Sequence, residues 1–215
     1  LDRDLGVTVQ DGESGDYAAL DADLGVVTHR DLLSANLDAY RRLMGAGLSI
    51  ACHGVQSYLP QSNDAEAAAE IEALALKNGV TFTGCGIWDM SRIWSGILTA
   101  GPCTELRSIH ISSLTDPEGQ TTSIEQIRQY CISEPVETFH ARGIATNAAA
   151  LAKKTIPEMV LRALGYTIVE STAVIEPVVY DVPVATRYDP SGFFEPGLVT
   201  GVRFRCTTTT AEGVI

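Results

Sequence analysis

The chain has 215 residues, of which 45% are hydrophobic, enough apolar material for one large domain or two small ones. Its 15 Lys and Arg and 27 Asp and Glu give a formal net charge of −12, which repels phosphate backbones and anionic lipid headgroups. The composition therefore argues against a nucleic-acid partner and against a membrane-surface role. The sequence has no signal-peptide pattern and no apolar run of roughly 20 residues, so we expect a cytoplasmic protein.

The first part of the chain alternates short apolar runs with helical patterns, which is typical of βαβ units with a parallel sheet. One helix is expected from about residue 36 to 44 with Ser34 as its cap, and a second opens at a capping box in residues 63–66 and ends at Gly79. The expected strands cover residues 6–9, 24–28, 49–52 and 80–83.

After Gly86 the pattern changes. A helix is expected from Thr155 to Gly165, because Pro157 suits its first turn and glycine suits the residue past its end. The closing region contains strands in direct succession, which predicts an antiparallel or mixed sheet. We therefore expect an α/β domain over residues 1–86 and an α+β domain over residues 87–215. The remaining expected elements are a strand at 108–112, a helix at 123–131 and strands at 167–175, 178–185 and 198–208.

The five cysteines are an odd number, and they show neither CxxC spacing nor Cys/His metal spacing. This pattern favours reduced, mostly buried thiols and predicts no metal site.

Three stretches carry a resemblance to a known family: GAGLSIAC at 45–52, KNGVTFTGCGI at 77–87 and LGYTIVESTAVIEPV at 164–178. They resemble the 2,4-diaminopentanoate dehydrogenase and native amine dehydrogenase family, within the dihydrodipicolinate reductase-like superfamily. The resemblance implies the C-terminal part of a Rossmann NAD(P)-binding domain, followed by a substrate and oligomerisation domain. It also implies NAD or NADP as cofactor, a homodimer or homotetramer, and hydride transfer that interconverts amines and carbonyl compounds.

The sequence departs from that family at three places. No Gly-rich phosphate-binding fingerprint is present, so we expect further polypeptide before Leu1 and weak dinucleotide binding by this chain alone. His53-Gly54 stands where amine-forming relatives carry an acidic pair, and residues 88–90 replace an Asn-Pro-Gly. Both of these changes fall at places that face the substrate.

His53 follows a predicted parallel strand, at the edge where doubly wound sheets bind ligands. Its imidazole can give or take the proton that accompanies hydride transfer, although a hydrogen-bonded loop histidine is the alternative. Asp89 is the second catalytic candidate, either holding a substrate nitrogen or orienting His53. Cys52 is expected to be a small buried residue at the cofactor edge, not a nucleophile.

The other candidates follow from the resemblance. His29 and Arg30 are expected near the diphosphate and ribose, unless Arg30 pairs with Asp31. The expected neighbours of the nicotinamide are Gly84, Gly86 and Ile87, for which an ordinary tight turn between the domains is the alternative. The expected substrate pocket contains Trp88, Met90, Trp94 and His140. For the two tryptophans, packing in the core is the alternative.

These observations favour an NAD(P)-dependent oxidoreductase that acts on a C=N or C=O group of a small, partly apolar substrate. One alternative is a carbonyl or cyclic-imine reductase without amine dehydrogenase activity. The other, from a different class, is a non-catalytic binding or assembly subunit on the same fold.

Overall fold

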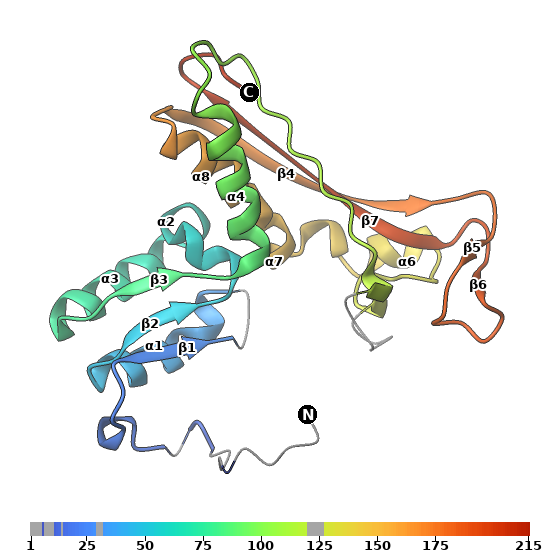
Figure 1. Cartoon of the computed structure of the whole chain (residues 1–215). Coiled ribbons are helices and arrows are strands. Elements are labelled where there is room, and N and C mark those ends of the chain that lie inside the picture. The colour runs from blue at the N-terminus through green and yellow to red at the C-terminus, as the bar shows by residue number, and fades with distance from the viewer. Residues whose placement is uncertain (1–5, 7–10, 14, 29–31, 120–126) are drawn as a thin grey trace. The chain divides into compact units, whose positions relative to one another are not determined.

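A computed structural model describes residue 6 and residues 11–13, 15–28, 32–119 and 127–215 (Figure 1). The chain divides into two compact units, Leu1–Gly84 and Cys85–Ile215, just before the boundary expected at Gly86. Residues 7–9 of the first expected strand and residues 123–126 of the expected 123–131 helix lie outside the described residues, and so do His29 and Arg30. In the part of the chain that is described, no helix is long and apolar enough to cross a bilayer.

The first unit is built on a three-stranded sheet, with β1 (Leu24–Val27), β2 (Ser49–Cys52) and β3 (Phe82–Gly84) in the order β1-β2-β3. Both strand pairs are parallel, as the sequence predicts. The connections run through α1 (Leu37–Gly45) and α3 (Ala65–Asn78), the helices that a parallel sheet requires between its strands (Figure 1). The short elements of this unit are η1 (Tyr17–Ala19), η2 (Ser34–Asn36), η3 (Val55–Tyr58) and α2 (Pro60–Asn63).

The ends of α3 follow the sequence signals. The Asp64 side chain caps the helix by accepting a hydrogen bond from the Ala67 amide at 3.0 Å, and Gly79 ends it in the left-handed conformation with φ of 67°. The expected cap of α1 is wrong. Ser34 lies in the 3-10 turn η2, and Asn36 occupies the N-cap position without a side-chain cap bond, because the turn runs directly into the helix.

Both helices cover the same face of the sheet. Tyr40 and Met44 of α1 and Ile71 of α3 pack against Ile50 and Cys52 of the central strand. The Tyr40 hydroxyl and the Cys52 sulfur lie 3.0 Å apart inside this core, and the ring of Tyr40 meets that of Phe82 edge-on at 5.1 Å. Burial, followed by this bond, raises the pKa of Tyr40 above its ordinary value.

The second unit opens with α4 (Ile87–Ala100), a helix that the sequence reading did not predict. It packs against α8 (Thr155–Ala163) through Ile93, Ile156 and Val160. Gly96 allows this contact, because a Cβ there would lie 2.8 Å from Cγ2 of Val160. The α8 helix matches its prediction and stops just before Gly165, whose φ is 87°.

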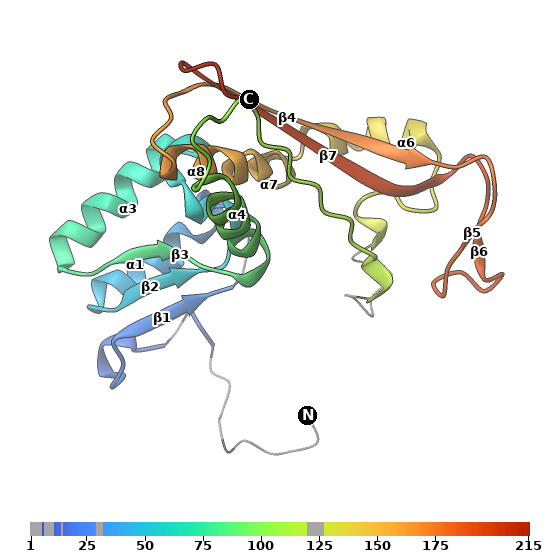
Figure 2. The same cartoon turned by 45° about the horizontal axis from the view of Figure 1, so that its top comes forward.

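The long strands β4 (Ile168–Val179) and β7 (Val199–Thr210) form an antiparallel two-stranded sheet (Figure 2). The predicted break between residues 175 and 178 is wrong, because β4 continues through Pro177; each strand of a two-stranded sheet has a free edge, where proline is tolerated. The expectation of one shared sheet is also wrong, since β5 (Val184–Ala185) and β6 (Phe193–Phe194) form a separate hairpin.

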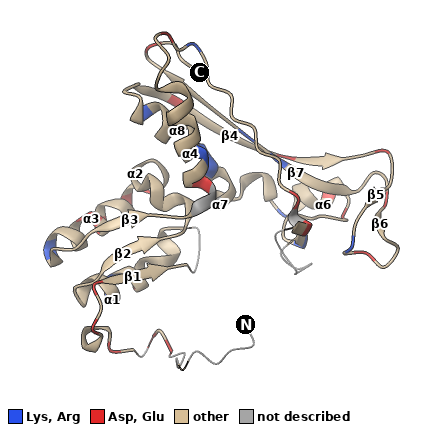
Figure 3. Cartoon of the chain, viewed as in Figure 1, with Lys and Arg blue, Asp and Glu red and all other residues tan. Residues whose placement is uncertain are grey.

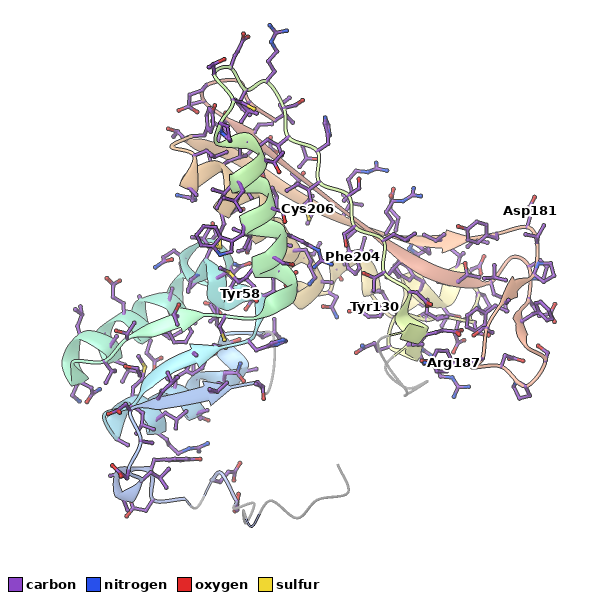
Figure 4. The ribbon with its side chains drawn as sticks, viewed as in Figure 1. Tyr58, Tyr130, Asp181, Arg187, Phe204 and Cys206 are labelled. Carbon is purple, nitrogen blue, oxygen red and sulfur yellow. The ribbon has the colours of Figure 1, made fainter. Side chains whose placement is uncertain are left out.

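Short helices cover one side of this sheet, and their core includes Phe139, Ile175 and Val199. At its margin the rings of Tyr130 and Phe204 meet edge-on, 6.2 Å apart (Figure 4). The helices are α6 (Val136–Ala141), η5 (Ile144–Thr146), α7 (Ala148–Leu151) and η6 (Ala152–Lys154).

The strand expected at residues 108–112 is absent from the structure. Its apolar alternation lies in an irregular segment that meets the end of the chain near its start: the Ile109 amide donates to the Ile215 carbonyl at 2.9 Å, and the Ile215 amide donates to the Arg107 carbonyl at 3.3 Å. Farther along, the Glu118 carboxylate in η4 (Pro117–Gly119) accepts from the Arg187 amide at 3.1 Å. Arg187 lies beside the β5/β6 hairpin (Figure 4).

Candidate functional site

The carboxyl ends of the three parallel strands form the candidate site of the first unit. Cys52 is the last residue of β2 and lies in register with Val27 of β1 and Gly84 of β3. His53 follows directly, and its amide donates to the Val27 carbonyl at 3.0 Å, so its backbone continues the sheet ladder. His53 is an exposed residue, and a group that contacts a ligand has to be accessible. Doubly wound sheets bind ligands at this edge.

The segment after His53 is fixed by buried polar side chains. The Ser57 hydroxyl donates to the Cys52 carbonyl at 3.0 Å and also contacts the Gly54 carbonyl. The Gln56 side-chain oxygen accepts from the Leu33 amide at 2.9 Å, which ties η3 to the segment that precedes α1. Sequence reasoning missed both residues, because neither stands in a recognisable motif. Together they hold the His53 turn in one conformation.

Gly84 has a structural reason to be glycine. A Cβ on it would lie 2.5 Å from Cδ1 of Tyr58 and 2.7 Å from the carbonyl oxygen of Ser57, closer than real Cβ contacts. The sequence interpretation offered a close approach to the nicotinamide or an ordinary tight turn as the reason. In the structure, the atoms that require it belong to η3.

Gly86 is the N-cap of α4, with φ of 133°, a value that favours glycine. The backbones of Ile87 and Trp88 form the first turn of this helix, and their side chains lie outside the described part of the structure.

Asp89 is buried and lies between two cations. Its carboxylate accepts from Nη1 of Arg92 at 2.8 Å and from Nζ of Lys153 at 3.2 Å. Arg92 also donates to the Ser113 hydroxyl at 3.0 Å. In Figure 3 the acidic and basic colours adjoin near the start of α4. Because two cations already face this carboxylate, a cationic substrate nitrogen would have to compete with them.

Lys153 was missed by sequence reasoning, because it is 64 residues from Asp89. Arg92 stands three residues after Asp89, a helical spacing that identifies the pair once α4 is recognised.

The expected pocket residues are divided between two helices. Met90 of α4 is half-buried and packs against the core of Ile93, Ile156 and Val160. Trp94 on the same helix is 55% exposed.

His140 lies on α6, away from α4 in both views (Figures 1 and 2). It is exposed, with its ring edge-on to Phe139 at 5.5 Å. Within the second unit, the candidate site residues at 86–94 therefore lie on α4 or at its N-cap, and His140 lies on a different helix.

The first unit brings together Cys52, His53 and Gly84, and the second places Asp89 at the start of α4. Contact between His53 and Asp89 stays a prediction. So do the cofactor contacts of His29 and Arg30, which lie outside the described residues.

No protein-family model matches the chain, and no curated protein matches it. Among solved structures, the fold is similar to the structure of amine dehydrogenase from Mycobacterium smegmatis, with a TM-score of 0.74 and 20% sequence identity. The match covers 100% of this chain and 62% of that chain, so this chain spans less than two thirds of the length of its neighbour. Over its whole length, the chain has an amine dehydrogenase-like α/β fold with a parallel sheet and separate antiparallel sheets.

Proposed function

We propose that this chain is part of an NAD(P)-dependent oxidoreductase that transfers hydride between the cofactor and a C=N or C=O group of a small, partly apolar substrate. The observation that carries the proposal is the amine dehydrogenase-like fold over the full chain. The exposed His53 at the carboxyl edge of the parallel sheet adds a proton-transfer group at the place where such folds bind ligands.

In this proposal the nicotinamide half of a dinucleotide lies at this edge, against the ends of β2 and β3, which are in register at Cys52 and Gly84. The Cys52 side chain is buried in the core and η3 occupies the Cβ direction of Gly84, so the contacts at this edge come from the backbone and from the exposed His53. The diphosphate half has no comparable place, because the 215 residues contain no Gly-rich fingerprint. We therefore expect residues 1–215 alone to bind NAD(P) weakly. When bound, the cofactor supplies the hydride chemistry.

The protein's own contribution in this proposal is the positioning and protonation of the substrate. His53 exchanges the proton at the substrate nitrogen or oxygen, since an imidazole changes its protonation near neutral pH. Ser57 and Gln56 act through the His53 turn as positioning residues, because their hydrogen bonds fix its backbone.

A second candidate is the reduction of carbonyls or cyclic imines without amine formation. Two observations favour it. His53 replaces the acidic pair of the amine-forming family that this sequence resembles, and the carboxylate of Asp89 on α4 already faces Arg92 and Lys153. A carboxylate with two cationic neighbours is poorly suited to bind a third positive group.

The test is His53→Ala in the complete gene product, assayed with small ketones and aldehydes in the presence and absence of ammonium. We expect kcat to fall at least about tenfold while NAD(P) affinity stays near the parent value, because general acid–base catalysis acts on the transition state. His110→Ala, which removes another exposed histidine, is the matched control and should leave kcat unchanged. An unchanged kcat in His53→Ala, with chemistry rate-limiting, would remove His53 from the mechanism.

The two candidate reactions form different products. Amine formation that requires ammonium supports the first candidate, and alcohol or cyclic amine formation without ammonium supports the second. His53→Glu restores an acidic side chain and should raise amine formation relative to carbonyl reduction.

A further inference from the structure

In the ion cluster at the start of α4, the cations outnumber the carboxylate (Figure 3). Nη1 of Arg92 lies 2.8 Å from Oδ1 of Asp89, and Nζ of Lys153 lies 3.4 Å from the same oxygen. One carboxylate balances the charge of only one of these cations, so one positive charge is left over. This excess lies in a chain whose formal net charge is −12. The cluster can therefore accept one further negative charge.

The other described charges near Lys153 do not remove this excess. Lys154 ends η6 and Glu158 lies one helical turn later on α8, and their opposite charges cancel. On β7 the thiol of Cys206 has Lys153, Lys154 and Glu158 in its surroundings. Burial raises the pKa of this thiol, so it is neutral at neutral pH. The positive charge thus belongs to Arg92 and Lys153.

The cations are also the accessible members of the cluster. The side chain of Asp89 is 9% exposed, whereas those of Arg92 and Lys153 are 23% and 35% exposed. An ammonium group has three N–H donors, and in the described structure the hydrogen bonds of Lys153 go to a single carboxylate, that of Asp89. The Ser113 hydroxyl accepts from Nη2 of Arg92 at 3.0 Å, so it can donate its own proton to a ligand. A ligand that approaches from solvent therefore meets positive groups and hydrogen-bond donors.

We propose that Arg92, Lys153 and Ser113 bind an anionic oxygen group of the substrate, either a carboxylate or a phosphoryl group. Hydrogen bonds from guanidinium and ammonium groups to such anions are stronger than those between neutral groups. The substrate class is then a small carbonyl compound with one anionic group. That the ligand is a substrate rests on the proposed function, whereas the anion site rests on the ion cluster alone.

Direct binding tests the anion site without turnover. Oxalate and inorganic phosphate present the two kinds of anionic group, and isothermal titration calorimetry with the complete gene product measures their Kd. Lys153→Met should weaken the binding of the anion that fits by at least about tenfold, because it removes a charged donor. Lys153→Arg keeps the charge and should retain more of the binding. Lys154→Met is the matched control, since Lys154 makes none of the described contacts with Asp89, and it should leave Kd unchanged.

Kinetics then test whether the substrate carries the anion. The value of kcat/KM is compared for 2-oxobutyrate, acetonylphosphonate and the neutral butan-2-one. We expect one anionic compound to be preferred over butan-2-one, and Lys153→Met to reduce this preference at least about tenfold. Ser113→Ala, at an exposed position, removes a neutral donor and should reduce it by a smaller factor, so the test does not depend on the folding of one variant.

The two measurements separate this proposal from the proposed function. Anion binding that Lys153→Met weakens, in a protein that reduces no carbonyl compound, would refute the oxidoreductase and support the anion site. The proposal would be overturned if neither oxalate nor phosphate binds, or if both bind Lys153→Met as tightly as the parent. Equal kcat/KM for the anionic and neutral compounds would overturn the assignment of the anion to the substrate.

Discussion

Replacing Gly84 with alanine tests whether this glycine serves the packing of η3. The new Cβ would lie 2.5 Å from Cδ1 of Tyr58 and 2.7 Å from the Ser57 carbonyl oxygen. Relief by movement of Ser57 is costly, because its amide bonds Gly54 at 2.9 Å and its hydroxyl bonds Cys52. Overpacking of this kind costs about 1–3 kcal/mol of unfolding free energy. For a chain of this length, that corresponds to a fall in Tm of roughly 2–12 °C.

The assay is thermal and urea unfolding of the cofactor-free protein. Gly45→Ala is the control, because Gly45 is the last residue of α1 and a Cβ added there would have no other atom within 4 Å. It should be neutral or stabilising by up to about 1 kcal/mol. A Gly84→Ala protein as stable as the parent would refute the packing argument. If such a protein lost only cofactor binding, the nicotinamide interpretation of Gly84 would be favoured.

Three further predictions concern other parts of the chain. Asp89→Asn leaves Arg92 and Lys153 without their shared carboxylate, and it should lower the unfolding free energy by about 1–3 kcal/mol in urea titrations, less than for a fully buried pair because both cations are partly exposed; an unchanged midpoint would contradict this. Burial raises the pKa of Tyr40 above 10.0, so the folded state keeps a proton that the unfolded state releases, and the unfolding free energy should fall as pH rises above about 10. In Tyr40→Phe the unfolding free energy should depend less steeply on pH in this range, and the same pH dependence as in the parent would contradict this prediction. The open face of the β4–β7 sheet, which includes Thr172, Val174 and Thr207, should form a subunit interface, so light scattering should give a dimer or tetramer that Val174→Glu weakens; a monomer at high concentration would exclude it.

The parallel sheet could be predicted because its signals are local. The apolar runs at 49–52 and 80–83, the Asp64 cap and the Gly79 stop each determine their conformation with neighbouring residues. His53 could be placed at the ligand edge for the same reason, since the residue after a parallel strand always lies at that edge.

Two of the wrong or missing predictions share a physical cause, because the partners of a residue are not visible in a local pattern, and the third concerns a helix. Residues 108–112 alternate like a strand, but in the part of the chain that the structure describes they pair with no strand, and their start bonds only Ile215. The α4 helix was missed although Met90, Ile93, Ile97 and Ala100 have helical spacing, because Trp88 and Trp94, six residues apart, do not share one helical face. Lys153 meets Asp89 only through tertiary structure.

The central claim is hydride transfer from a nicotinamide cofactor, and deuterium transfer tests it most directly. The complete gene product would be incubated with NADH or NADPH deuterated at C4 and with a panel of small ketones and aldehydes, with and without ammonium. Mass spectrometry should find one deuterium on the former carbonyl carbon of an amine or alcohol product, at a yield that falls at least about tenfold in His53→Ala. Product that carries no deuterium from either C4 face, or a gene product that binds neither nucleotide, would contradict the account.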